Sequence, residues 1–297
     1  SREPGGVAFL SQSGGHAVDF SLIGAWRGVR FSKVVSFGNG CDLRETEMLR
    51  YLARDKETTV ICMYIEGLAD GADFLSALKA AAMAKPVLVI KGGLSDSGGR
   101  AAASHTGSMG GQKQIWEAAL RQSGAIRLES VEELADASLA FTLLPPRTYR
   151  GCSIVGGGGA LGIAAADAAE SLGLAIPPLR PDLAESVMEL LPKPGSSASN
   201  PIDVANPFVP PRTIKEILIR ASEDDTIDLH ILVFLIYHFK AQKDVMGAGN
   251  LKDFIPAREM ADACRESREL TNKPVVLVMP NYRQEEDALD QIGRAHV

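Results

Sequence analysis

The sequence lacks several features that mark particular classes of protein. Its 31 Lys and Arg residues do not outnumber its 37 Asp and Glu residues, which leaves a net charge of −6, and no basic cluster is present. Neither a nucleic acid nor an anionic membrane is therefore expected as its main partner. The longest apolar run, residues 231–237, is far short of the roughly 20 residues that a membrane-spanning helix needs. Four scattered cysteines form no CxxC pair, which predicts neither a disulfide framework nor a zinc site and favours the cytoplasm.

Aromatic residues are also few, at 6%, whereas glycine is abundant, with 29 residues in a chain of 297. Many glycines suit the tight turns between the strands and helices of an α/β protein. With 45% hydrophobic and 23% charged residues, the composition is that of a folded globular protein. At about 150 residues per domain, the length predicts two domains.

Predicted strands and helices alternate along the chain. Short apolar segments such as residues 60–65 predict strands covered on both faces, and amphipathic stretches such as residues 44–54 predict helices. This rhythm predicts an open α/β fold with parallel sheets. Pro145 and Pro146 interrupt the rhythm and predict a domain boundary, and residues 195–211 are expected to form a polar, proline-rich loop.

Both ends of the sequence are expected to be cut. There is no initiator Met, and a predicted strand begins at Val7, so no signal peptide is expected before it. Residues 292–297 read like the translation of a sequencing adapter, so we interpret them as a non-native tail and leave His296 out of the site. The predicted domains are residues 1–146 and residues 147–291, the second truncated at its carboxyl end.

The segment Ser11-Gln12-Ser13-Gly14-Gly15 follows the first predicted strand and opens a predicted helix. The unpaired N–H groups and the dipole of a helix N-terminus favour an anion, small residues let it approach, and the hydroxyls of Ser11 and Ser13 add donors. Gly14 and Gly15 would then lie against a phosphate. An ordinary tight turn with a serine N-cap explains the same residues and stays an alternative.

A second glycine-rich turn, Gly156-Gly157-Gly158-Gly159, lies between another predicted strand and helix. It is similar to a dinucleotide fingerprint, but no acidic residue ends the following strand, so a phosphate or oxyanion fits better than NAD. Gly157, Gly158 and Gly159 are the candidate phosphate-binding residues of this turn. A purely structural turn is the alternative.

His105 lies in a long loop of small residues, and Glu66 lies just after the strand predicted at residues 60–65. A loop of small residues on a rigid scaffold can carry a moving catalytic group, and an imidazole can act as a nucleophile near neutral pH. Glu66 could accept a hydrogen bond from one imidazole nitrogen and leave the other free to attack. A solvated loop histidine and a salt-bridged glutamate are the alternatives. If the two sheets face each other, both helix N-termini can point at a phosphate on His105.

At this point the chain resembles the NDP-forming acyl-CoA synthetases, relatives of succinyl-CoA synthetase. The histidine lies in an SHTG motif that follows a KPV strand, and the resemblance covers nearly all of the chain. The matching stretches are GGVAFLSQSGG, FGNGCD, YIEG, KPVLVIKGG and GRAAASHTGSMGG in the first half, and GGGGALGIAAAD and LLPKPGSSASNPIDV in the second.

The resemblance implies a role for each matched residue. His105 matches the histidine that is transiently phosphorylated, and Glu66 matches the glutamate that steadies it. The helices after Gly14 and Gly159 match two helices that bind the phosphate. Other residues in or beside these motifs are candidates for support of the phosphate site, without a role derived for each: Arg100, Ser104, Thr106, Asn200 and Asp203.

The resemblance also implies a fold and an activity. The fold would be two flavodoxin-like open parallel-sheet domains of the succinyl-CoA synthetase type. The activity would be that of an acid–thiol ligase, which forms acyl-CoA from a small carboxylic acid, CoA and ATP through a phosphohistidine and an acyl phosphate, and releases ADP and phosphate. CoA and ATP/ADP would be substrates, with no metal bound by a motif in this chain.

Members of this family also have a CoA-binding Rossmann domain and an ATP-grasp domain or subunit, which would bind the nucleotide with Mg²⁺. Neither is recognised in this sequence, so the fragment is expected to be inactive alone and to belong to an oligomer. Two alternatives remain from the sequence. One is a non-catalytic CoA- or nucleotide-binding regulatory module of an acyltransferase-fused relative, and the other is a small-ligand module without covalent chemistry.

Overall fold

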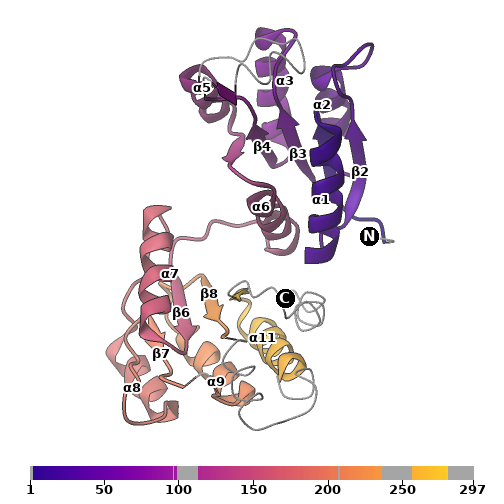
Figure 1. Ribbon diagram of the computed structural model, residues 1–297. Helices are drawn as coiled ribbons and strands as arrows, with labels where there is room; N and C mark the ends of the chain where they lie inside the picture. The colour runs from indigo at the N-terminus through magenta and orange to yellow at the C-terminus, as the bar shows by residue number, and fades with distance from the viewer. Residues whose placement is uncertain (1–2, 96, 99–112, 207, 236–255, 280–297) are drawn as a thin grey trace. The chain divides into compact units, whose positions relative to one another are not determined.

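The computed structural model describes residues 3–95, 97–98, 113–206, 208–235 and 256–279, and the structural statements below concern these residues. The chain divides between Leu144 and Pro145 into two compact units. Each unit is built on a sheet of parallel strands (Figure 1). This confirms the predicted α/β class with parallel sheets.

The sheet of the first unit has five parallel strands in the order β2-β1-β3-β4-β5. The strands are β1 (Val7–Ser11), β2 (Phe31–Ser36), β3 (Val60–Ile65), β4 (Val87–Lys91) and β5 (Ile126–Leu128). The helices described in this unit are α1 (Gly14–Arg27), α2 (Glu45–Arg54), α3 (Gly71–Ala84), α5 (Lys113–Ser123) and α6 (Val131–Leu143).

Helices cover both faces of this sheet, which is why its central strands are apolar at consecutive positions. In β1, Ala8 and Leu10 pack on one face with α2, α3 and α5, and Val7 and Phe9 pack on the other with α1 and α6. Side chains alternate between the faces of a strand, so a strand covered on both faces reads as a continuous apolar run. Helix α1 is capped at its carboxyl end by Gly28, whose φ of 99° is one that glycine adopts without a steric penalty.

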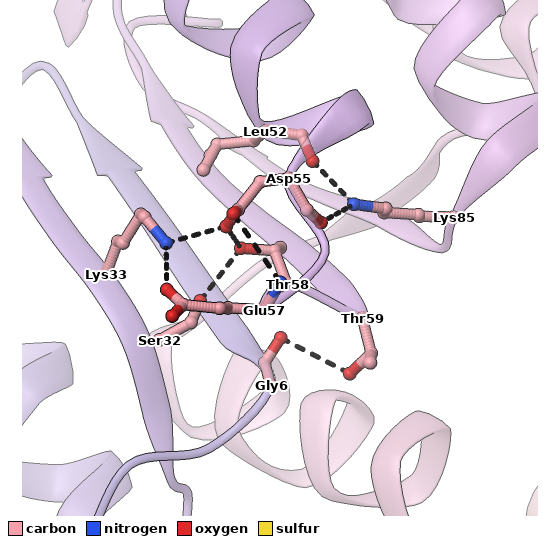
Figure 2. A network of polar contacts seen from close by, with 9 residues as sticks. All are labelled: Gly6, Ser32, Lys33, Leu52, Asp55, Glu57, Thr58, Thr59 and Lys85. Atoms are coloured by element: carbon pink, nitrogen blue, oxygen red, sulfur yellow. Dashed lines mark hydrogen bonds and ion pairs between the residues drawn. The ribbon is translucent and has the colours of Figure 1, made fainter.

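A network of polar contacts joins the amino-terminal ends of the strands in the first unit (Figure 2). Asp55 follows α2 and accepts hydrogen bonds from Lys33 on β2 at 2.7 Å and from Thr58 at 2.6 Å. Lys85, just before β4, donates to the carbonyl oxygens of Leu52 and Asp55. The Lys33 ammonium, and then the Thr58 hydroxyl, lower the pKa of Asp55 to about 2. The network links the strands at their amino-terminal ends, opposite to the end of the sheet where the strands finish.

The sheet of the second unit has four parallel strands in the order β7-β6-β8-β9. The strands are β6 (Cys152–Gly156), β7 (Ile202–Asp203), β8 (Leu229–Val233) and β9 (Val275–Val278). The helices described in this unit are α7 (Gly159–Ser171), α8 (Pro181–Leu190), α9 (Pro211–Ala221) and α11 (Ala257–Thr271).

The core of the second unit contains a buried histidine. Helices α8, α9 and α11 pack on one face of the sheet and α7 packs on the other. His230 on β8 is fully buried, with Nδ1 2.6 Å from the Ser153 hydroxyl and Nε2 2.7 Å from the Ser222 hydroxyl. Burial, and then the nearby Lys273 charge, lower its pKa to about 3. The imidazole is therefore neutral near pH 7, and it holds β8 to β6 and to the end of α9.

The expectation of a loop at residues 195–211 was partly wrong, because this segment contains the edge strand β7. Its two residues pair with Val155 and Gly156 of β6. A strand of two residues next to a proline carries no alternation that a pattern could reveal. None of the described helices is long and apolar enough to cross a membrane.

Candidate functional site

The candidate site of the first unit lies where its strand order reverses. Strands β1 and β3 are neighbours, but the chain leaves β1 for α1 on one face and leaves β3 for α3 on the other. In open parallel sheets the diverging loops leave a crevice at the carboxyl ends of such strands, and ligands bind there. The two predicted groups that follow these strands, Ser11–Gly15 and Glu66, therefore meet at this edge.

Gln12 joins the two strand ends directly. Its side chain is buried, and Oε1 accepts the backbone N–H groups of Glu66 at 2.7 Å and Gly67 at 3.0 Å. Its own backbone N–H donates to the carbonyl oxygen of Tyr64. Because Gln12 satisfies the backbone donors just after β3, the position of Glu66 is tied to the turn that opens α1.

The N-terminus of α1 is open to an anion. The Ser13 hydroxyl caps the helix by accepting the His16 N–H at 3.3 Å, whereas the Ser11 hydroxyl donates to the Ser13 carbonyl oxygen. Gly14 and Gly15 are exposed, and a Cβ on either would meet nothing closer than 3.7 Å. Neither has a positive φ. Packing and backbone conformation therefore do not require these two glycines, and a ligand can approach the backbone there.

The two carboxylate oxygens of Glu66 differ in their surroundings. Oε1 accepts a hydrogen bond from the Tyr64 hydroxyl at 3.1 Å. Oε2 is buried and has no hydrogen-bond partner among the described residues. An unpaired buried carboxylate oxygen is costly to maintain, so a donor is expected to fill this position during function.

A buried lysine lies beside the backbone of Glu66. Lys91, at the end of β4, is 6% exposed, lies 5.0 Å from the centre of the Trp116 ring and donates to the carbonyl oxygens of Glu66 and Gly92. Burial lowers its pKa to about 8, against an opposing effect of Glu66. Its ammonium ties the end of β3 to the end of β4.

Three of these side chains, those of Gln12, Tyr64 and Lys91, were not predicted from the sequence as part of the site. A signal for Lys91 was present, because a single cation ends the otherwise apolar strand VLVIK. Tyr64 and Glu66 are two positions apart and so share a strand face. Gln12 offered no pattern, since its contact joins residues more than 50 positions apart.

The N-terminus of α7 in the second unit is arranged differently. The Asp203 carboxylate at the end of β7 accepts the backbone N–H groups of Gly158 at 3.3 Å and Ala205 at 2.8 Å. A Cβ on Gly159 would lie 3.2 Å from Asp203 Oδ2. Gly158 has a φ of 116°, which an L side chain rarely adopts. An intrinsic anion therefore lies where a phosphate was predicted, and Gly157 is buried beside it.

Asn200 has a structural role in the described contacts. Its Oδ1 accepts the Ile154 N–H at 2.9 Å, and its Nδ2 donates to the carbonyl oxygens of Cys152 and Pro177 at 2.8 Å each. The side chain thus pairs with β6 beyond the end of the short strand β7, as a neighbouring strand would. This accounts for Asn200 without a ligand.

Four predicted site residues, Arg100, Ser104, His105 and Thr106, lie outside the described residues. The parts of the chain that the structure describes contain no group of three or more His, Cys, Asp or Glu side chains that could hold a metal ion.

Comparisons with known proteins agree with this fold. Residues 4–141 match the succinyl-CoA ligase-like flavodoxin domain. The chain is 40% identical, over 83% of its length, to an ADP-forming acetate–CoA ligase I of Archaeoglobus fulgidus, and spans 35% of that protein. It is 33% identical, over 95% of its length, to the α subunit of an ADP-forming acetate–CoA ligase II of Pyrococcus furiosus, and spans 59% of it.

A solved structure gives the same result. The dinucleotide-forming acetyl-coenzyme A synthetase 1 of Ca. Korarchaeum cryptofilum, in complex with phosphate and ADP, matches 99% of this chain with a TM-score of 0.79 and 26% identity. The chain spans 63% of that protein. The chain therefore spans between about a third and two thirds of the length of these relatives.

Proposed function

We propose that this chain, which belongs to the NDP-forming acyl-CoA synthetases, is the phosphohistidine core of an acid–thiol ligase. The complete enzyme would form acyl-CoA from a small carboxylic acid, CoA and ATP, and would release ADP and phosphate. His105 would carry the phosphoryl group, and Glu66 would hold the imidazole.

The observation that carries this proposal is the state of the Glu66 carboxylate. It lies at the strand-order reversal of the sheet, with one oxygen bonded to Tyr64 and the other buried without a partner among the described residues. An imidazole N–H is a suitable donor for that second oxygen. Such a bond fixes the tautomer of the ring, so that the opposite nitrogen carries the lone pair that attacks phosphorus.

The proposed reaction has three steps. A ring nitrogen of His105 attacks the γ-phosphorus of ATP, and ADP leaves. A carboxylate oxygen of the acid then attacks the same phosphorus, which breaks the P–N bond and yields an acyl phosphate. The thiol sulfur of CoA finally attacks the acyl carbon, the C–O bond to the phosphate breaks, and inorganic phosphate leaves with the thiol proton. The charge on the phosphoryl group would be stabilised by the N–H groups and dipole at the start of α1.

We further propose how the rest of the enzyme is arranged around this core. Residues 1–146 would be the domain that carries the phosphohistidine loop, and residues 147–291 the second ligase domain. A CoA-binding Rossmann domain and an ATP-grasp domain or subunit would supply CoA and the nucleotide with its Mg²⁺. Helix α7 would bind the phosphate in one step, and Asp203 would have to release the Gly158 N–H when it does.

The proposal is tested by phosphoryl transfer to the chain itself. The purified chain is incubated with acetyl phosphate carrying ³²P, and the protein is examined for label that is stable in base and labile in acid. Label on the wild type and on a His238→Ala control, but not on His105→Ala, is the expected result. Label that persists on a folded His105→Ala variant would contradict the proposal.

The same measurement separates the alternatives. If the folded wild type takes no label, the reaction is repeated with an ATP-grasp subunit and ATP. Label that then appears on His105 supports the ligase core. A continued absence of label supports a regulatory module that only binds CoA or nucleotide.

A further inference from the structure

The hydroxyl of Tyr64 touches the carboxylate on which the proposed function depends. Tyr64 lies on β3 two residues before Glu66, so the two residues lie on the same face of the strand. Its ring belongs to the core on the side of α1 and α6, and it is 9% exposed. Its hydroxyl donates to Glu66 Oε1 at 3.1 Å.

Gly92 provides the space that this contact needs. A Cβ on Gly92 would lie 2.5 Å from the Tyr64 hydroxyl oxygen and 3.4 Å from Cγ of Glu66. Gly92 does not have a positive φ, so its backbone does not require glycine. The requirement comes from the two side chains that meet beside it.

The ring of Tyr64 and the backbone of Glu66 are also held. The His16 ring, in the first turn of α1, stacks on the Tyr64 ring with centroids 4.0 Å apart and an angle of 19° between the planes. Lys91 donates to the carbonyl oxygens of Glu66 and Gly92. Both ends of the contact are therefore fixed by neighbours, and the hydroxyl is not a flexible surface group.

The Tyr64 hydroxyl remains a hydrogen-bond donor over the pH range in which a ligase works. Burial, followed by the charge of Glu66, raises the pKa of Tyr64 to about 12. The hydroxyl is therefore protonated near pH 7. It donates to the carboxylate in a charge-assisted hydrogen bond, which is stronger than a bond between neutral groups.

We infer that Tyr64 is a positioning residue: its hydroxyl fixes Oε1 of Glu66, so that Oε2 is the oxygen presented to the imidazole, and Gly92 keeps the space in which this happens. This inference rests on the proposed function for its consequence in the reaction. Without the hydroxyl, the carboxylate could rotate about its terminal torsion, which is soft and has no strongly preferred angle. A smaller fraction of molecules would then hold the imidazole correctly.

The contact is tested first without any phosphoryl chemistry. The five tyrosines are labelled with ¹³C at Cζ, the Tyr64 signal is assigned with Tyr64→Phe, and the chain is titrated with base. In a Glu66→Gln variant the Tyr64 midpoint should fall from about 12, because the neighbouring negative charge has gone. An unchanged midpoint would overturn the inferred contact.

The consequence for the reaction is tested next, with the acetyl phosphate assay. Tyr64→Phe should lower the first-order rate constant of labelling about tenfold with little change in the concentration for half-saturation, as expected for one lost charge-assisted bond. Gly92→Ala should lower it as well. Tyr51→Phe, an exposed tyrosine on α2, serves as the matched control.

The outcomes separate the two claims. Labelling of Tyr64→Phe at the wild-type rate would overturn the positioning role and leave the proposed function standing. A wild type that stays unlabelled even with an ATP-grasp subunit and ATP, together with the expected fall in the Tyr64 midpoint, would leave the contact standing and contradict the proposed function instead.

Discussion

The two units share an architecture but differ at the N-termini of their first helices. In both, a parallel strand is followed by a glycine-rich turn and a helix, and the strand order reverses beside that strand. The start of α1 is capped by the neutral Ser13, and the start of α7 faces the carboxylate of Asp203. A glycine-rich turn before a helix therefore does not by itself define an anion site. The group opposite the helix N-terminus decides what it binds.

The glycines of the two turns are explained by different causes. In the second unit, a Cβ on Gly156 would lie 2.9 Å from Cβ of Val233, and Gly158 has a positive φ. Both are required by the fold. In the first unit, Gly14 and Gly15 are required by neither packing nor conformation. This contrast favours the first unit as the one shaped for a ligand.

The largest expected effect comes from Glu66, whose carboxylate has one buried oxygen without a hydrogen-bond partner among the described residues. Glu66→Gln should lower the rate of His105 labelling by about 100-fold, within the range found when a positioned acid–base group is lost. The measurement is the labelling rate with acetyl phosphate. Asp203→Asn is the comparison, with an expected change below tenfold. Equal losses in the two variants would remove the distinction between the units.

Asn200 should affect stability rather than chemistry. Its amide makes three hydrogen bonds that hold β6, so Asn200→Ala should destabilise the second unit by about 2–4 kcal/mol, at roughly 1 kcal/mol per bond. Denaturant unfolding, followed by hydrogen exchange of the β6 amides, measures this. A small loss of stability combined with lost labelling would instead assign Asn200 to the phosphate site.

The two units should also differ in how their stability changes at acidic pH. The pKa of His230 is lowered to about 3 in the folded unit, against about 6.5 when unfolded. Unfolding therefore takes up a proton between these values. The stability that comes from the neutral imidazole is complete above pH 6.5 and falls below it, by up to about 1.4 kcal/mol per pH unit.

Asp55 in the first unit loses its contribution to stability at a lower pH than His230 does. Its pKa is lowered from 3.8 to about 2, so its contribution is complete above pH 4 and is lost as the pH falls toward 2. When the thermal unfolding of each unit is measured from pH 7 down to pH 4, the second unit should lose stability first. His230→Gln should reduce that slope. Parallel loss in both units would contradict this assignment.

Glycine substitutions in the two turns should give the smallest effects. Gly158→Ala should cost about 1–3 kcal/mol of stability, because its positive φ is strained for an L side chain. Gly14→Ala should cost little stability, since a Cβ there meets nothing closer than 3.9 Å, but it should weaken phosphate binding. Thermal unfolding and phosphate titration separate the two effects. The reverse pattern would show that the first turn is the structural one.

Much of the fold could be predicted from the sequence, because strands covered on both faces read as apolar runs and helices follow at a regular rhythm. The strand Val60–Ile65 has the expected bounds. Strand β7 could not be predicted, because its two residues owe their conformation to β6 and Asn200 rather than to their own pattern.

The candidate site could be predicted only in part. Ser11–Gly15 and Glu66 follow strands, so their common edge was predictable from the topology of parallel sheets. Their connection through Gln12 and the contact of Tyr64 with Glu66 depend on distances between strands, which no local pattern records. That the Asp203 carboxylate faces the N-terminus of α7 was missed for the same reason.

The central claim, that the first unit presents an open anion site and the second a filled one, is tested most directly by phosphate titration. Inorganic phosphate is added to the ¹⁵N-labelled chain, and the amide signals of Gly14, Gly15, Gly158 and Gly159 are followed by NMR. We expect saturable shifts at Gly14 and Gly15 and none at Gly158 and Gly159 until Asp203 is replaced by Asn. Saturable shifts at Gly158 and Gly159 in the wild type, with none at Gly14 and Gly15, would contradict the account.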